Sequence, residues 1–176
     1  VGVTGIFFGG DGIDQVIDLY GVFAGEAGDD WVGTVFATGQ FCGGDDTDIF
    51  QGGEGDDLLH AALHGAGGDD FFGGPGIDTV TYAFSSQGVV VTVAPSPNAD
   101  DGRQGEIDEL VSGVENVTGT QQADTLTGDA GDNQLEGLAG GDEITGGGGR
   151  DTLVAADGAD AIRARDGIAD RSIDCG

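Results

Sequence analysis

The sequence predicts an all-β fold, a parallel β-solenoid with two strands in each eighteen-residue coil. Three observations predict it: a nine-residue pattern recurs, each copy has a large apolar residue at the same place, and glycine and aspartate fill the rest. The clearest copy is Gly146–Val154, with the sequence GGGGRDTLV. The pattern is Gly-Gly-x-Gly-x-Asp-x-U-x, where U is a large aliphatic or aromatic residue. Repeats at such a fixed period form stacked structures in which each unit packs on its neighbours.

Residues 1–81 form a first block of repeats. Four consecutive copies follow one another from Gly25 to His60, and Asp18–Ala24 is an irregular or shortened repeat just before them. The period breaks at Ala61–His64 and then resumes with Asp70 and Phe72. The residues predicted at the aspartate position of this block are Asp14, Asp30, Asp48, Asp57, Asp70 and Asp78, with Gly39 in place of one aspartate. The apolar positions are Val16, Val32, Phe41, Phe50, Leu59, Phe72 and Val80.

Residues 82–109 interrupt the pattern. The segment Gly88–Val93 is rich in valine, which predicts a strand, and the following Pro95–Gly102 has the proline and acidic residues of a surface loop. This segment is either a linker between two domains or an enlarged coil of one continuous solenoid. We favour the enlarged coil, because strand-like residues flank the loop on both sides.

Residues 110–176 form a second block, in which six nine-residue repeats begin at Leu110. Their aspartate positions hold Glu115, Asp124, Asn133, Asp142, Asp151 and Asp160. Their apolar positions hold Val117, Leu126, Leu135, Ile144, Leu153 and Ile162. Six apolar residues at a strict nine-residue spacing are not expected by chance, so this block is the most regular part of the predicted solenoid.

The spacing also predicts metal sites. Each repeat supplies a six-residue turn and a three-residue strand, whose central apolar side chain points inward. Coils stack about 4.8 Å apart, so an aspartate and the one eighteen residues later lie on the same edge. The pairs are Asp30 with Asp48, Asp124 with Asp142, Asn133 with Asp151, and Asp142 with Asp160; if Ala61–His64 loops out, Asp48 also faces Asp70. Carboxylates and turn carbonyls make an all-oxygen environment that suits several Ca²⁺ ions, whereas Zn²⁺ prefers histidine and cysteine.

Composition supports a cation-dependent fold. The chain has 176 residues, a formal net charge of −28, five arginines and no lysine. Such charge opposes compaction unless cations neutralise it, and it excludes a nucleic-acid partner. Disorder is the alternative for an acidic, glycine-rich chain, but apolar residues in strict register argue against it. No apolar run is long enough to span a membrane. One core residue per repeat is little, so we expect folding and calcium binding to be coupled.

The repeats resemble the RTX, or haemolysin-type, calcium-binding repeats, and the match is most specific over Gly119–Arg163. Ser112–Gly119 and Asp78–Tyr82 are also similar to this family. The resemblance implies a right-handed parallel β-roll secreted by a bacterium. It also implies a chain that stays unfolded in calcium-poor cytosol and folds outside the cell, with calcium ligands at the aspartate positions and nearby turn carbonyls.

The predicted function is a secreted, non-catalytic calcium-binding β-roll with a structural, matrix or surface role. The sequence contains no H-E-x-x-H metalloprotease motif and no G-x-S-x-G lipase motif. One alternative is the calcium-folded tail of a larger secreted enzyme or toxin. Another is an extracellular filament, surface-layer subunit or homo-oligomer that assembles through uncapped ends, where Cys42 or Cys175 could link chains; free thiols are the other expectation for these cysteines.

Overall fold

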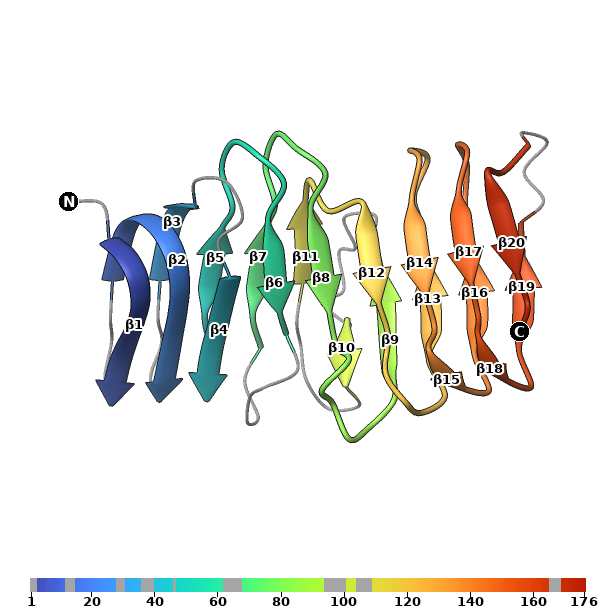
Figure 1. Ribbon diagram of the computed structural model, residues 1–176, viewed down its shortest axis with the longest axis horizontal. Helices are drawn as coiled ribbons and strands as arrows, with labels where there is room; N and C mark the ends of the chain where they lie inside the picture. Colours follow the sequence, from blue (N-terminus) through green and yellow to red (C-terminus); the bar gives the residue numbers. More distant parts are fainter. Residues whose placement is uncertain are drawn as a thin grey trace.

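In a computed structural model, the chain forms a parallel β-solenoid whose coils stack along the long axis of the molecule (Figure 1). The structure describes residues 3–11, 15–27, 31–35, 40–45, 47–61, 68–93, 101–103, 109–164 and 169–176. All regular structure in these ranges is β-strand. The same ranges contain no helix with the length and hydrophobicity that a membrane span requires. The predicted fold class is therefore confirmed.

The described strands form three sheets. The largest contains β1 (Val3–Asp11), β2 (Gln15–Ala27), β3 (Trp31–Val35), β4 (Gln40–Asp45), β5 (Ile49–Gln51), β6 (Leu58–His60), β7 (Asp70–Phe72), β8 (Thr79–Thr81), β11 (Glu109–Ser112), β12 (Asn116–Thr118), β14 (Gln134–Glu136), β17 (Thr152–Val154) and β20 (Ser172–Asp174). The second contains β9 (Val89–Thr92), β10 (Gly102–Arg103), β13 (Thr125–Thr127), β16 (Glu143–Thr145) and β19 (Ala161–Arg163). Two short strands in the turns, β15 (Ala139–Gly140) and β18 (Asp157–Gly158), form the third.

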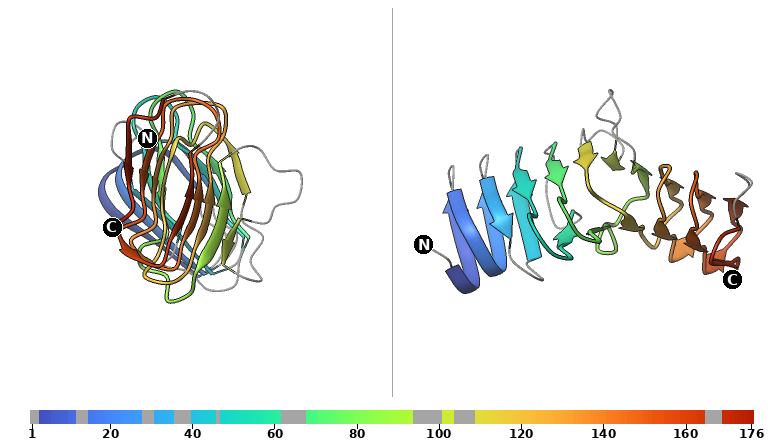
Figure 2. Two further views of the ribbon diagram at one scale, coloured as in Figure 1. Left: turned by 90° about the vertical axis from the view of Figure 1, so that its right-hand side faces the viewer. Right: turned by 90° about the horizontal axis from the view of Figure 1, so that it is seen from above.

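The long strand β2 connects the two faces of the solenoid. Its first half pairs with β3 and its second half with β4, so the largest sheet contains strands from both faces. From there, β3, β5 and β7 continue one face, while β4, β6, β8, β12, β14, β17 and β20 continue the other. The turns between faces form two edges (Figures 1 and 2). We call the edge with the turns preceding β6, β8, β12, β14 and β17 the upper edge, and the opposite one the lower edge.

Strand register confirms the repeat where it is regular. Leu126 lies opposite Ile144, and Leu135 lies opposite Leu153, each pair eighteen residues apart. Near the N-terminus Val16 lies opposite Val32, a separation of sixteen that matches the shortened repeat predicted at Asp18–Ala24. The coil length is therefore set by the turns, while the strands keep a constant register.

The coil that contains residues 61–69 corrects one prediction. Phe50 lies opposite Phe71, twenty-one residues later, and the predicted partner Phe72 lies one position further along the strand. Phe71 is 1% exposed, whereas Phe72 is half-buried on the outer surface. The apolar position here is Phe71, because the side chains of a strand alternate between faces and a shift of one residue exchanges inside for outside.

The segment between the two blocks changes the order of strands along the axis. β12 pairs directly with β8, so the face formed by these strands continues without a break. On the other face, β11 pairs back with β7, whereas the earlier strand β9 pairs forward with β13. β10 runs antiparallel along the free side of β9, so it satisfies backbone groups that an exposed strand edge would leave unpaired. The strand predicted at Gly88–Val93 is confirmed as β9.

The core is a column of apolar side chains between the two faces. Ten residues at apolar positions of the described coils are at most 1% exposed: Phe50, Leu59, Phe71, Val80, Val91, Val117, Leu126, Leu135, Ile144 and Leu153. In the regular coils these residues lie opposite one another in register, as Leu135 lies between Val117 and Leu153. This core is narrow, because the strands are three residues long and only the central residue points inward.

Candidate metal centre

Aspartates on the lower edge form a ladder that links successive coils. The backbone N–H of Asp124 donates to Oδ1 of Asp142 at 2.9 Å, and the N–H of Asp142 donates to Oδ1 of Asp160 at 2.9 Å. The N–H of Val89 donates to Oδ1 of Asp124 at 2.8 Å, so the ladder begins at β9. Each carboxylate therefore accepts a hydrogen bond from the preceding coil on its edge.

The upper edge carries a second ladder of the same kind. The N–H of Asp57 donates to Oδ1 of Asp78 at 2.8 Å, and the N–H of Asp78 donates to Oε2 of Glu115 at 2.9 Å. Further along, the N–H of Asn133 donates to Oδ1 of Asp151 at 3.0 Å, and that of Asp151 to Oδ1 of Asp170 at 3.2 Å. Both edges thus place carboxylates in rows along the axis.

Several of these carboxylate oxygens are buried and have no hydrogen-bond partner. Among the described residues they include both oxygens of Asp57 and the Oδ2 atoms of Asp78, Asp142 and Asp160. Burying a carboxylate oxygen without a partner is strongly unfavourable. A bound cation would satisfy these oxygens and also neutralise the charge. The unpartnered oxygens are therefore the positions where the fold itself requires a ligand.

The first glycine of each repeat lies directly against the carboxylate of that repeat. A Cβ built on Gly52 would be 2.6 Å from Oδ2 of Asp57, and one on Gly73 would be 2.5 Å from Oδ2 of Asp78. Real Cβ atoms do not approach so closely. Glycine is needed at this position because the carboxylate of the same repeat and a turn carbonyl of the adjacent coil both occupy the space that a side chain would fill.

Burial also weakens the acidity of these groups in the ion-free protein. Burial, together with the nearby Asp78 and Asp56, raises the pKa of Asp57 to about 7. Burial raises the pKa of Asp78 to about 6, and the charge of Glu115 adds to this although the hydrogen bond from the Asp57 backbone opposes it. On the lower edge, burial raises the pKa values of Asp124 and Asp142. The charged forms therefore lack stabilisation that a cation would provide.

The donor set fits a hard cation such as Ca²⁺. Among the residues that the structure describes, no group of three or more histidine, cysteine, aspartate or glutamate side chains could hold a metal ion by itself. Any site must therefore combine carboxylates of adjacent coils with backbone carbonyls of the glycine-rich turns. A set made of oxygens alone suits Ca²⁺, which accepts six to eight such ligands in flexible geometries.

A family model describing the RTX calcium-binding nonapeptide repeat matches residues 43–80, 111–144 and 136–168, which together make up more than half of the chain. The chain belongs to the RTX calcium-binding repeat family. RTX repeats bind Ca²⁺, so the fold is a calcium-binding RTX β-roll. A comparison with curated proteins found none that matches the chain.

The stretch of the RTX roll between the matched ranges 43–80 and 111–144 coincides with the change in strand order. There β9 keeps the core position with Val91, but Val89 stands where the next coil on this edge has Asp124. A valine at this place supplies a backbone N–H to the ladder and no carboxylate. The RTX pattern is therefore interrupted in this coil, because Val89 replaces the aspartate whereas Val91 keeps the apolar core position.

Most of the predicted ligand positions lie on the two ladders of the RTX roll. The structure brings together Asp124 with Asp142, Asn133 with Asp151, and Asp142 with Asp160, as the eighteen-residue spacing predicts. Asp48, Asp57 and Asp78 are also buried on ladder positions. Asp14 and Asp30 lie outside the described residues. Whether each of these side chains binds an ion stays a prediction.

The register predicted for Asp70 is wrong, and Asp69 takes its place. The N–H of Asp48 donates to Oδ1 of Asp69 at 3.0 Å, and Asp69 is 5% exposed. Asp70 begins β7, where its side chain lies on the outer surface. The two adjacent aspartates both fit the pattern locally. Counting nine residues back from Asp78 selects Asp69, and this signal was available in the sequence.

One further ladder residue, Asp170, was not predicted. It lies nineteen residues after Asp151 and three before Ile173, whereas the regular pattern places the aspartate two residues before the apolar position. The extra residue hides Asp170 from a search at strict spacing. Glu115 was placed on the ladder by its position, and its longer side chain reaches the N–H of Asp78 from a shorter turn.

Proposed function

We propose that this RTX β-roll is a secreted, non-catalytic module that folds when it binds calcium and then serves as a rigid structural element in an extracellular matrix or at a cell surface. The observation that carries this proposal is the set of buried, unpartnered carboxylate oxygens on both edges of the solenoid. They make the ion-free fold unfavourable at neutral pH, and bound cations remove that penalty.

The residues that would hold the ions are the ladder carboxylates and the carbonyls of their turns. On the lower edge we assign Asp48, Asp69, Asp124, Asp142 and Asp160; on the upper edge we assign Asp57, Asp78 and Asp151. Bound Ca²⁺ would supply positive charge between coils. The chain's own residues determine where that charge is needed, because glycines such as Gly52 and Gly73 leave room for each carboxylate to lie against its turn.

Calcium supplies stability that the core lacks. Ordering the backbone of nine residues opposes folding, and each regular repeat buries only one apolar side chain to offset that cost. An ion that binds only to the folded chain adds stability as its concentration rises above its dissociation constant. Folding should therefore follow the calcium concentration, which is low in cytosol and millimolar outside cells. This dependence favours an extracellular role.

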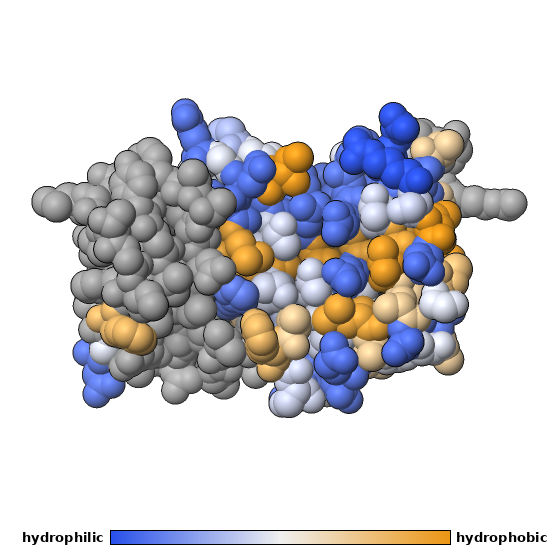
Figure 3. All heavy atoms as spheres, viewed as in Figure 1, coloured by the Kyte–Doolittle hydropathy of each residue, from blue (hydrophilic) through white to orange (hydrophobic). Residues whose placement is uncertain are grey.

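A structural role is favoured over a catalytic one because the buried polar groups serve the ladders. On both edges the buried carboxylates face the backbone of adjacent coils, where a substrate could not reach them. On the face shown in Figure 3, hydrophilic residues and apolar residues are interspersed over the described coils. These features suit a spacer or matrix element.

The proposal is tested by measuring folding and ion binding together. Far-UV circular dichroism of the full chain is recorded in EDTA and during titration to millimolar calcium, with magnesium as the matched control cation. Isothermal titration calorimetry gives the number of ions. We expect a cooperative gain of β-structure with calcium and little with magnesium, which prefers a smaller, octahedral site. Identical spectra in EDTA and calcium would refute coupled folding.

A further inference from the structure

Among the described residues of the two ladders, Asn133 on the upper edge is the one that carries an amide in place of a carboxylate. Asn133 stands at an aspartate position and is 4% exposed, and both polar atoms of its amide have a hydrogen-bond partner within the protein. Its Nδ2 donates to the carbonyl oxygen of Glu115 at 3.0 Å, and its Oδ1 accepts from the N–H of Asp129 at 2.9 Å. Only one orientation of the amide satisfies both partners, because a carbonyl needs a donor and an N–H needs an acceptor.

This pattern contrasts with Asp142, which is buried to the same degree on the lower edge. The Oδ2 atom of Asp142 has no hydrogen-bond partner, whereas no atom of the Asn133 side chain is left without one. The amide is also neutral, so the upper edge of this coil carries one negative charge less than it would with an aspartate. The need for an external cation that exists at Asp142 is therefore absent at Asn133.

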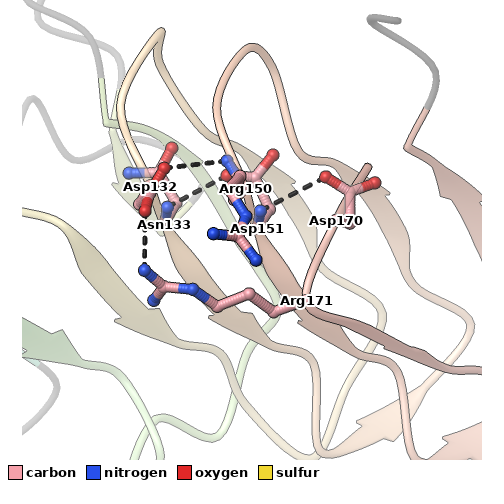
Figure 4. Close-up of polar contacts among 6 residues, drawn as sticks. All are labelled: Asp132, Asn133, Arg150, Asp151, Asp170 and Arg171. Carbon is pink, nitrogen blue, oxygen red and sulfur yellow. Dashed lines mark hydrogen bonds and ion pairs between the residues drawn. The ribbon is translucent and has the colours of Figure 1, made fainter. Parts of the chain in front are cut away.

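A fixed cation of the protein lies beside Asn133. Nη2 of Arg171 contacts Oδ2 of Asp132 at 2.6 Å, although the two residues are thirty-nine positions apart. The arginine side chain starts beside β20 and runs back along the edge past the coil of Asp151 (Figure 4). The other oxygen of Asp132 accepts the backbone N–H of Arg150 at 2.9 Å. Both oxygens of this carboxylate are thus satisfied by the protein, and its charge is paired with a guanidinium.

The neighbouring turn is also too short to complete an oxygen cage. Three residues, Gly113–Glu115, connect β11 to β12, whereas six residues connect β13 to β14 and another six connect β16 to β17. An open cavity of about 420 Å³ occupies the space beside the short turn, lined by Glu115, Asp132, Asn133 and Arg171 among others. The turn carbonyls that would face an ion between Glu115 and Asn133 are therefore missing.

We propose that no calcium ion binds between the turns of Glu115 and Asn133 or between the turns of Asn133 and Asp151. The Asn133 amide and the Arg171 guanidinium take the place of the ion there. The upper edge is then interrupted by a position that needs no calcium, while the lower edge keeps its ions at Asp142 and Asp160, whose Oδ2 atoms have no hydrogen-bond partner. This inference rests on the proposed calcium ligands and goes beyond them, because it states where the repeat pattern does not correspond to an ion.

Crystals of the full chain grown in millimolar calcium test the inference directly through anomalous diffraction. We expect ion peaks on the lower edge next to Asp142, and none between the turns that contain Asn133 and Asp151. An ion at Asn133 with others on the lower edge would overturn the inference alone. A complete absence of ions from the structure would overturn both this inference and the proposed function.

Calorimetry of two variants tests the same claim in solution. Asn133→Asp replaces the amide donor by a carboxylate oxygen without a partner, so we expect one additional calcium ion per chain, held between the two regular six-residue turns that end at residue 133 and at Asp151. The matched variant Asp142→Asn should lose at least one ion. An unchanged ion count in Asn133→Asp would contradict the inference, and if this variant does not fold, the crystals of the unaltered chain decide.

The role of Arg171 has its own control. Arg171→Gln should lower the melting temperature at limiting calcium by about 1–3 °C while the ion count stays the same. Arg163→Gln removes an ion pair with Glu143 on the outer face of the sheet, at similar exposure and away from the ladder. If both substitutions lower the melting temperature equally, or if the number of bound ions changes in Arg171→Gln, then Arg171 does not replace a calcium ion beside Asn133.

Discussion

The close contact between a turn glycine and its carboxylate leads to a sharp prediction for Gly137→Ala. A Cβ at this position would lie 3.0 Å from Cγ of Asp142 and closer still to Oδ2, with the carbonyl oxygen of Ala155 at 3.2 Å on another side. The carboxylate must therefore move by roughly 1 Å to restore ordinary contacts. That movement breaks the 2.9 Å hydrogen bond that Asp142 accepts from the N–H of Asp124.

The size of the effect follows from these two terms. Steric strain of this kind costs about 1–3 kcal/mol, and losing a hydrogen bond to a charged group costs about 1.5–3 kcal/mol. Partial relaxation leaves about 3 kcal/mol, which corresponds to roughly a hundredfold weaker calcium binding at this edge. Gly141→Ala is the matched control in the same turn, because its Cβ would meet the carbonyl oxygen of Ala159 at 3.7 Å, an ordinary contact.

The assay compares the calcium concentrations at which the two variants and the unaltered chain reach half of their β-structure by circular dichroism. We expect a large increase for Gly137→Ala and almost none for Gly141→Ala. Equal midpoints for the two variants would refute the reasoning, since both remove a glycine from one turn and differ in what the new methyl group contacts.

Three further predictions concern the core, the pH dependence and the corrected register. Leu135→Ala should lower the free energy of unfolding of the calcium-loaded protein by about 2–5 kcal/mol in urea titrations, because the side chain is fully buried; a change under 1 kcal/mol would contradict this packing. In EDTA, burial and neighbouring carboxylates raise the pKa of Asp57 to about 7 and that of Asp78 to about 6, above the ordinary 3.8. Stability that is present below pH 4 is therefore lost as the pH rises through 6 and 7. Circular dichroism in EDTA should show more β-structure at pH 5 than at pH 8, and Asp57→Asn should flatten that dependence. Asp69→Ala should weaken calcium binding in calorimetry and Asp70→Ala should not; the reverse order would restore the register predicted from the sequence.

The period of the sequence is enough to predict which residues pack and which face each other in the regular part of the chain. A strand has two faces and a fixed rise, so a nine-residue repeat with one apolar residue places Leu135 between Val117 and Leu153 whatever the turns do in detail. The same spacing predicts that Asp124, Asp142 and Asp160 lie in a row, and the structure agrees.

The prediction fails at two places near irregular turns. Asp69 and Asp70 at the start of β7 both fit the pattern on local grounds, and the count back from Asp78 and the pairing with β5 select Asp69. Asp170 escapes the pattern because one extra residue separates it from Ile173, yet its side chain reaches the N–H of Asp151. A turn can accommodate one inserted residue and still place its carboxylate on the ladder, whereas a search at a strict nine-residue spacing misses that residue.

By itself, the sequence determined the solenoid class, the inward-facing column and the need for cations, because these follow from local alternation, repetition and net charge. Only the tertiary structure decided that β11 returns to β7 while β9 pairs with β13, since strands of similar composition pair equally well until the chain path and the neighbouring coils choose between them. It also brought Arg171 against Asp132, a contact between residues in different coils that no repeat spacing contains. Contacts between equivalent positions of adjacent coils follow from the nine-residue period. Contacts between residues in more distant coils depend on the number of residues in each turn.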